Sequence, residues 1–252
     1  LSLNKYDLIF VTDGKKRSIY ISILKKAKFK YLFTPSETIK KIFGKFFNKV
    51  FLIDYNLPKI KLIESFLKEI NCDLNDKDIN FILNYENSNS LPPNILRKDY
   101  IILNFDEKWI FNNYIKTYKN IQPTYDQFNE FILKLSEILN VVIVNGNKSN
   151  PILNTFKPIN TNRITIKDKI NIFEFQSLIK NCKYIITCHG APSHIASNYG
   201  IKIIDIIDES EKIFFESYNF HFKNKTQLIR EDFSKLSQKI LDTLYVNSNK
   251  NL

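Results

Sequence analysis

The chain has 252 residues, enough for one large domain or two small ones, which rules out a miniprotein that depends on disulfides or a metal for its stability. Hydrophobic residues make up 44% and charged residues 25% of the sequence, a balance that excludes a disordered or fibrous protein. Lys and Arg number 37 against 26 Asp and Glu, giving a net charge of +11, so we expect an anionic partner such as nucleic acid, lipid headgroups or a phosphorylated glycan.

The cysteines and the apolar runs predict a cytoplasmic protein. Cys72, Cys182 and Cys188 are scattered and form no C-x-x-C pair, so they indicate neither a disulfide framework nor a zinc ribbon. No apolar run approaches the ~18 to 20 residues that span a bilayer, and residues 1–10 lack the basic and then apolar pattern of a signal peptide. The sequence contains no Met, not even at position 1, so we expect that the native start lies outside it.

Strand-like and helix-like runs alternate from the start of the chain. We expect strands at 7–12, 29–33 and 49–54, and helices at 15–27, from Ser36 onward and at 62–70. Ile19 and Ile23 follow helical spacing in the first helix, and Ser36 is a typical N-cap for the second.

The prolines of LPPN (91–94) separate this series from a second one. Two adjacent prolines fit neither a helix interior nor a central strand, so we expect two domains, 1–92 and 93–252. In the second we expect strands at 100–105, 141–146, 163–166, 184–187, 202–207 and 226–229, and helices at 123–139, at 171–182, from about Pro192 and from about Glu231. The last helix has one apolar face, which predicts packing on its domain. The alternation predicts an α/β protein with two Rossmann-like parallel sheets.

Residues 184–200, YIITCHGAPSHIASNYG, carry the strongest functional signal. Gly190 permits close backbone approach after a buried strand, and Pro192 fits the first turn of a helix. Backbone N–H groups at a helix start and the positive end of its dipole form an anion site suited to a diphosphate. His189 and His194, two of only three histidines, can donate hydrogen bonds to phosphate or stabilise a departing diphosphate.

Two other interpretations of this loop are open. Gly190 and Pro192 can simply shape a tight turn from strand to helix, with histidines that serve the structure. A zinc site formed by Cys188, His189 and His194 is the other alternative, although their spacing matches no common zinc pattern.

The same loop resembles the signature of glycosyltransferase family 9, the heptosyltransferases of lipopolysaccharide synthesis, which typically reads Asn-Asp-Ser-Gly-Pro-x-His-x-Ala followed shortly by Gly. Pro192, His194, Ala196 and Gly200 agree with this pattern. Residues 188–191 replace the Asn-Asp-Ser-Gly part, so that a histidine stands where family members have an acidic group by the donor.

Further segments resemble the family in the same order along the chain. They are Gly14, Arg17 and Ser18 after the first strand, the Lys108-Trp109 pair, residues 123–146 ending at Gly146, and residues 163–190 leading into the signature. The resemblance implies a two-domain GT-B fold, with an amino-terminal acceptor-side domain that is incomplete here and a carboxy-terminal domain that binds the nucleotide sugar.

The chemistry that the resemblance implies is metal-independent, inverting transfer of a sugar from a nucleotide diphosphate sugar to a hydroxyl of the acceptor. The leaving diphosphate needs positive or dipolar stabilisation. The candidates for this are Lys108, Gly146, Lys148, His189, Gly190, Ala191, Pro192, Ser193 and His194. For Lys108 and Lys148 a solvated surface lysine is the alternative.

The general base is harder to assign. The family's catalytic Asp lies in a segment upstream of the region where this chain begins, so we expect the first βα units to be left out of it. Asp13 lies at a strand end facing the expected cleft and is our catalytic candidate, although it can instead cap a turn or helix. Arg17 can hold an anionic acceptor or lie on a helix surface.

We therefore expect a bacterial, cytoplasmic glycosyltransferase with no cofactor or metal, and leave open peripheral contact with the inner face of the membrane. Its partners would be a nucleotide-sugar donor and an anionic glycan or glycolipid acceptor of lipopolysaccharide or capsule type. A non-catalytic nucleotide-sugar-binding module of the same fold and a basic nucleic-acid-binding protein are the alternatives. The latter is disfavoured because the sequence has no clustered Arg stripe, zinc-finger spacing or RNA-binding aromatic motif.

Overall fold

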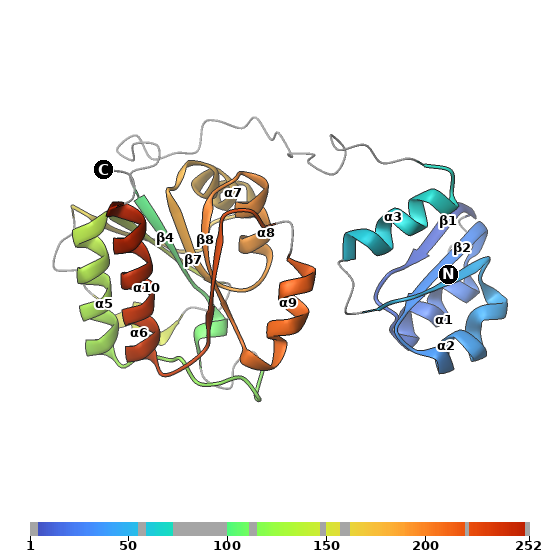
Figure 1. Cartoon of the computed structure of the whole chain (residues 1–252), viewed down its shortest axis with the longest axis horizontal. Coiled ribbons are helices and arrows are strands. Elements are labelled where there is room, and N and C mark those ends of the chain that lie inside the picture. The colour runs from blue at the N-terminus through green and yellow to red at the C-terminus, as the bar shows by residue number, and fades with distance from the viewer. Residues whose placement is uncertain are drawn as a thin grey trace. The chain divides into compact units, whose positions relative to one another are not determined.

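The computed structural model describes residues 5–54, 59–72, 100–110, 115–146, 150–156, 162–219 and 222–249. The chain forms two compact units, one made of Leu1–Ile79 with Glu216–Phe220 and the other of Asn80–Phe215 with His221–Leu252. Each unit is built on its own parallel sheet (Figure 1). The expected boundary at 91–94 lies outside the described residues, so the domain limits 1–92 and 93–252 stay predictions.

The first unit has a three-stranded parallel sheet of order β1-β2-β3. Its elements are β1 (Lys5–Val11), α1 (Lys16–Leu24), β2 (Lys26–Thr34), α2 (Glu37–Phe43), η1 (Gly44–Phe46), β3 (Lys49–Leu52) and α3 (Lys59–Glu69). Successive residues of β2 point to opposite faces, so Leu32 packs with Ile19 of α1 while Phe33 packs with Phe66 of α3. As expected, Ser36 caps α2, its hydroxyl accepting a hydrogen bond from the Ile39 amide at 3.2 Å.

The second unit has a six-stranded parallel sheet of order β6-β5-β4-β7-β8-β9. Its strands are β4 (Tyr100–Phe105), β5 (Asn140–Asn145), β6 (Ile164–Lys167), β7 (Tyr184–Cys188), β8 (Lys202–Ile207) and β9 (Lys225–Ile229). Its helices are α5 (Tyr125–Ile138), α6 (Pro151–Thr155), α7 (Ile172–Asn181), α8 (Ala191–Asn198) and α10 (Phe233–Asn249), with 3-10 turns η2 (Glu107–Trp109) and η3 (Glu209–Glu211). Helix α9 (Lys212–Tyr218) begins in this unit, and its residues from Glu216 onward belong to the first.

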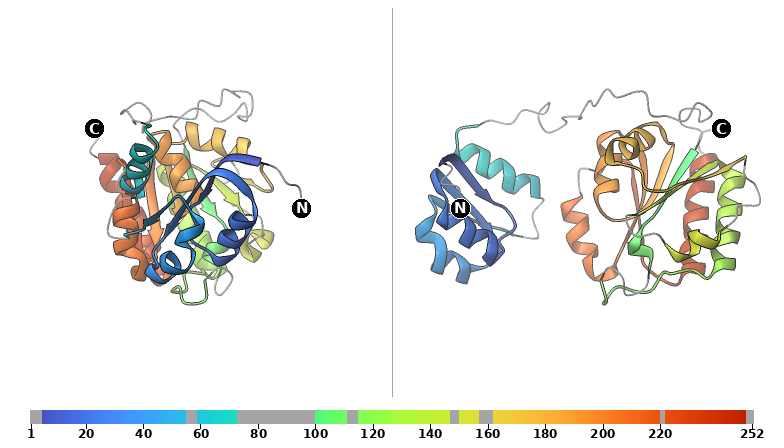
Figure 2. Two further views of the ribbon diagram at one scale, coloured as in Figure 1. Left: turned by 90° about the vertical axis from the view of Figure 1, so that its right-hand side faces the viewer. Right: turned by 180° about the vertical axis from the view of Figure 1, so that it is seen from behind.

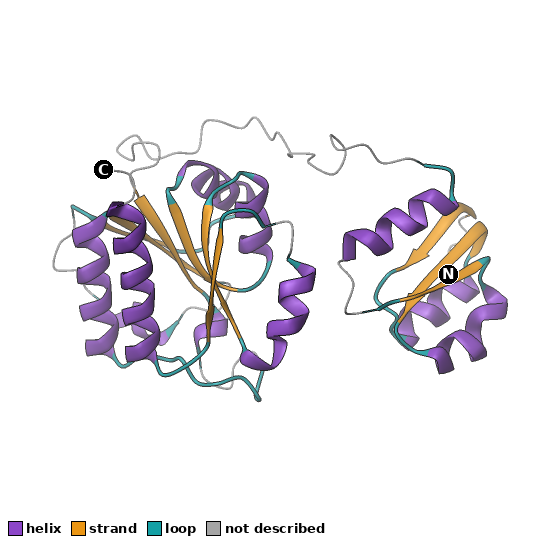
Figure 3. Cartoon of the chain, viewed as in Figure 1, coloured by secondary structure: helices purple, strands orange, loops and turns teal. Residues whose placement is uncertain are grey.

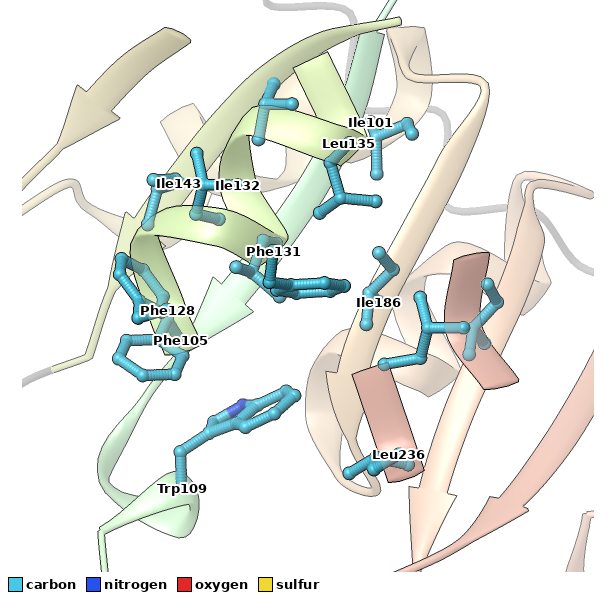
Figure 4. Close-up of a cluster of buried hydrophobic side chains, with 14 of the residues drawn as sticks. Ile101, Phe105, Trp109, Phe128, Phe131, Ile132, Leu135, Ile143, Ile186 and Leu236 are labelled. Carbon is cyan, nitrogen blue, oxygen red and sulfur yellow. The ribbon is translucent and has the colours of Figure 1, made fainter. Parts of the chain in front are cut away.

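Helices cover both faces of this sheet (Figure 3). Helices α5 and α10 lie side by side on one face (Figures 1 and 2), where Phe131 and Leu236 meet Ile186 of β7 in the larger core cluster (Figure 4). On the other face, Leu178 of α7 and Ala196 of α8 join the second cluster. The apolar face of the last helix therefore packs on its own domain, as its spacing predicted.

The strand order places a topological switch point beside β4. From β4 the chain builds β5 and β6 on one side, and β7, β8 and β9 on the other. The connections after the carboxyl ends of β4 and β7 thus diverge, and in parallel sheets this is where ligands bind. These connections contain η2 and residues 189–190.

The predicted fold class, α/β with two parallel Rossmann-like sheets, is confirmed. Each expected strand and helix has a counterpart in the structure, whereas α6, α9 and the 3-10 turns are additional. No helix in the described part of the chain is long and apolar enough to cross a membrane.

Candidate functional site

Lys108 lies against the loop between β7 and α8. Its ammonium donates a hydrogen bond to the carbonyl oxygen of His189 at 2.8 Å and lies 3.8 Å from Oδ2 of Asp106. The Lys108 side chain is only 14% exposed, so it is not a solvated surface lysine. The structure thus joins two segments that are 81 residues apart in the sequence and that both follow carboxyl ends of adjacent strands.

A buried polar network holds the η2 turn that carries Lys108. Asp106 caps this turn, its Oδ1 accepting from the Lys108 amide at 3.0 Å. The Asn104 side-chain amide donates to Asp106 Oδ2 and to Thr187 Oγ1, both at 3.0 Å, and the Trp109 indole donates to the Asn104 carbonyl at 2.9 Å. Burial raises the pKa of Asp106, while the Lys108 charge and amide act in the opposite direction. The network ties the end of β4 to the end of β7.

Two glycines allow the backbone to pass close to these side chains. A Cβ atom at Gly190 would overlap Nζ of Lys108. A Cβ atom at Gly146, which follows β5, would lie 2.9 Å from Cβ of Asp106. Gly190 thus makes the close backbone approach that the sequence predicted, and Gly146 brings the end of β5 against the same η2 turn.

The β7–α8 loop continues the sheet for one residue and then turns into the helix. The His189 amide donates to the Ile206 carbonyl at 2.9 Å, and the Gly190 carbonyl accepts from the amides of Ser193 at 3.0 Å and His194 at 3.4 Å. The rings of His189 and His194 are neighbours, with their centroids 5.5 Å apart. Both histidines of the predicted site, the Lys108 ammonium and the first turn of α8 are thus gathered at one edge of the sheet.

A buried aspartate lies beneath this loop. Asp205 of β8 has no exposed surface. Its Oδ2 lies 2.8 Å from Nδ1 of His189, and its Oδ1 accepts a hydrogen bond from the Ser193 hydroxyl at 2.7 Å. The Ser193 hydroxyl, which we expected to contact substrate, is therefore directed to Asp205 inside the fold.

Arg230, which follows β9, holds the other side of η2. Its guanidinium donates to the Lys108 carbonyl at 2.8 Å, to the Lys119 carbonyl at 3.3 Å and to Sγ of Cys188 at 3.4 Å. Burial raises the pKa of the Cys188 thiol to about 12, so it stays protonated at neutral pH. Over the described residues, no group of three His, Cys, Asp or Glu side chains is arranged to hold a metal ion.

The two remaining described candidates lie in the first unit. Asp13 accepts hydrogen bonds from the Ser18 hydroxyl at 2.8 Å and the Lys15 amide at 3.1 Å. These are the contacts expected if Asp13 caps the turn or helix that follows it. The Ser18 hydroxyl and the Lys15 amide lower the pKa of Asp13. Arg17 is exposed on α1. Lys148 lies outside the described residues.

Comparison with known proteins identifies the fold. No protein-family model and no curated protein sequence matches the chain. Among solved structures, heptosyltransferase WaaC of E. coli with ADP matches with a TM-score of 0.65 and 14% identity, over 99% of this chain and 74% of that one. A family 9 glycosyltransferase from Veillonella parvula matches with a TM-score of 0.62 and 13% identity, over 97% of this chain and 75% of that one. The chain has the GT-B fold of the family 9 heptosyltransferases.

Other nucleotide-sugar enzymes share this fold. A UDP-GlcNAc 2-epimerase from Methanocaldococcus jannaschii matches with a TM-score of 0.52 and 15% identity, over 95% of this chain and 69% of that one. At these identities the likeness to the heptosyltransferases and to the epimerase is one of fold. The activity therefore has to be argued from the residues of the site.

Proposed function

We propose that the chain is a glycosyltransferase that moves a sugar, with inversion, from a nucleotide diphosphate sugar to a cell-envelope glycan of lipopolysaccharide or capsule type. The observation that carries this proposal is the Lys108 ammonium, held against the β7–α8 loop at the switch point of the sheet. A cation and a helix start at this place suit the diphosphate of such a donor.

Charge stabilisation is the part of the reaction that the described residues can perform. The diphosphate gains negative charge as the sugar leaves, and a preorganised cation at that point lowers the barrier. Lys108 is preorganised because Asp106 caps its turn and Arg230 binds its carbonyl oxygen. His194 adds a ring N–H group that can donate to a phosphate oxygen, and His189 contributes through its carbonyl oxygen, which accepts the hydrogen bond from Lys108.

The solved neighbours support a nucleotide donor. The E. coli heptosyltransferase WaaC was determined with ADP and with ADP-2-deoxy-2-fluoro heptose. These ligands contain the diphosphate for which we propose the Lys108 site. The sugar, the nucleotide base and the anionic acceptor, for which Arg17 is our candidate contact, belong to the same proposal.

A second candidate function is a nucleotide-sugar-binding module without transferase activity. The environment of Asp13 favours the binding module, because two hydrogen bonds and a lowered pKa make its carboxylate a weaker base. The two candidates share the donor site and differ only in turnover.

Titration calorimetry on the whole chain with ADP, UDP, GDP and CDP tests the shared site. We expect one of these nucleotides to bind, and Lys108→Met to weaken its binding roughly 10- to 100-fold, the equivalent of one charge-assisted contact. Lys134→Met is the matched control, since it removes the same charge from an exposed ion pair with Glu130 on α5. If no nucleoside diphosphate binds at millimolar concentration, both candidates are wrong.

Turnover then separates the two candidates. Release of nucleotide from nucleotide sugars, with and without envelope glycans as acceptors, identifies a transferase. Binding without turnover across the whole panel, in a protein that includes any residues preceding Leu1 in its gene, identifies the binding module.

A further inference from the structure

We propose that Asp205 is a positioning residue of this site, which keeps the proton of His189 on Nδ1 and clamps the β7–α8 loop on both sides of Gly190. The effect of Asp205 on ligand binding rests on the proposed function, whereas the position of the proton on His189 does not. No motif in the loop itself signals this role, because Asp205 lies on the neighbouring strand.

The first step in the argument is the burial of Asp205. Its side chain has no exposed surface and lies inside the apolar strand KIIDII. A carboxylate in such a place is strongly destabilising unless its oxygens are hydrogen-bonded. Both oxygens are bonded, Oδ1 to the Ser193 hydroxyl and Oδ2 to Nδ1 of His189. Within the described residues, His189 is also the one basic side chain within ion-pair distance of Asp205, and the contact is ionic only in the imidazolium form.

The second step is the location of the His189 proton. An ionised carboxylate only accepts hydrogen bonds, so the 2.8 Å contact requires the N–H on Nδ1. The hydrogen bond made by one ring nitrogen decides the role of the other. In neutral His189, Nε2 is then the acceptor nitrogen, and in the imidazolium form it becomes a second donor.

The third step is how Asp205 holds the loop in place. Strand pairing places Asp205 opposite Thr187, so its side chain lies next to the end of β7. His189 precedes Gly190 and Ser193 follows it, and Asp205 binds both. The same His189 supplies the carbonyl oxygen that accepts from Lys108. Asp205 thus fixes both the His189 ring and the start of α8. By fixing His189 it also positions the carbonyl oxygen that binds the Lys108 ammonium.

Nitrogen NMR of the histidine side chains tests the proton position directly. The chain has only three histidines, and His189→Gln identifies the signal of His189. In the ligand-free protein, at a pH above ~8 where an ordinary imidazole is neutral, we expect the Nδ1–H tautomer for His189. The Nε2–H tautomer in the wild-type protein would overturn the proposal, and this measurement needs no folded Asp205 variant.

Two variants separate positioning from packing. In Asp205→Asn the side-chain amide can donate to Nδ1, so we expect His189 to change to the Nε2–H tautomer. In Ser193→Ala the contact between Asp205 and His189 is kept, so the tautomer should stay Nδ1–H. The same tautomer in Asp205→Asn and in the wild type would contradict the proposal, because loss of packing alone does not exchange the protonated nitrogen.

Nucleotide affinity completes the experiment. Calorimetry with the nucleoside diphosphate that binds the wild type should show about tenfold weaker binding to Asp205→Asn, equivalent to ~1.4 kcal/mol. The reason is that a neutral amide makes weaker hydrogen bonds to His189 and Ser193 than a carboxylate does and so holds the loop less firmly. An unchanged affinity in this variant would overturn the role of Asp205 in the site. If the tautomers behave as expected but no nucleotide binds the wild type, the proposed function fails and the hydrogen-bonding role of Asp205 stands.

Discussion

Gly190→Ala tests whether Lys108 has to lie against the backbone of the β7–α8 loop. A Cβ atom at position 190 would overlap Nζ of Lys108, so the ammonium has to move and lose its hydrogen bond to His189. Gly190 has a φ of 161°, an extended conformation that alanine adopts without strain. The substitution therefore acts on the lysine and not on the path of the loop.

The expected magnitudes follow from this one contact. A hydrogen bond of a charged group contributes ~1.5–3 kcal/mol, but the displaced ammonium regains water, so we expect the free energy of unfolding to fall by only about 1 kcal/mol. Nucleotide affinity should fall roughly 10- to 100-fold, because the cation no longer lies where the diphosphate would bind. Calorimetry with the bound nucleotide and denaturant unfolding measure the two quantities.

Gly200→Ala is the matched control for this experiment. Gly200 has a φ of 66°, and a Cβ atom at this position would have no neighbouring atom within 4 Å. Alanine there strains the backbone by roughly 1–2 kcal/mol without reaching the site. We expect it to lower stability and leave affinity unchanged. Equal affinities for Gly190→Ala and the wild type, or an equal loss in both variants, would refute the reasoning.

Three further predictions concern the framework around the site. Arg230→Lys should lower the free energy of unfolding by ~2 kcal/mol and weaken nucleotide binding, measured by denaturation and calorimetry, because lysine cannot make all three guanidinium contacts. Asp13→Asn should lower the melting temperature near neutral pH, because hydrogen bonds, first that of the Ser18 hydroxyl, put the pKa of Asp13 below 3.8. A carboxylate with a lowered pKa stabilises the folded protein above pH 3.8, so the difference in melting temperature between variant and wild type should disappear as the pH falls through the pKa of the folded state. Leu236→Ala should cost ~2–5 kcal/mol in urea unfolding because this side chain is completely buried, whereas Val246→Ala, 55% exposed on the same helix, should cost less than about 1 kcal/mol.

The fold was predictable because its signals are local. Strand β4 coincides with the expected range 100–105, a run that is apolar except for Asn104 and in which all six residues are buried. Asn171 forms a capping box with Glu174, which defines the start of α7. Helices α6 and α9 have only five and seven residues, too few for a periodic pattern to identify them.

The site was predictable only in part. The β7–α8 loop and Lys108 can be found from motifs in the sequence, but Asn104 and Asp205 cannot. Both lie opposite Thr187, one on each neighbouring strand. Their contacts with the end of β7 and the loop after it depend on the strand order, which local sequence patterns do not contain. The signal that points to them is a single polar side chain inside an otherwise apolar strand, because such a residue needs a buried partner.

The most direct test of the central claim is a crystal structure of the whole chain with the nucleoside diphosphate that it binds. The account predicts phosphate oxygens within hydrogen-bond distance of Nζ of Lys108 and of the loop from His189 to His194. A nucleotide bound elsewhere, with the Lys108 ammonium still on the His189 carbonyl and no phosphate beside it, would contradict the account.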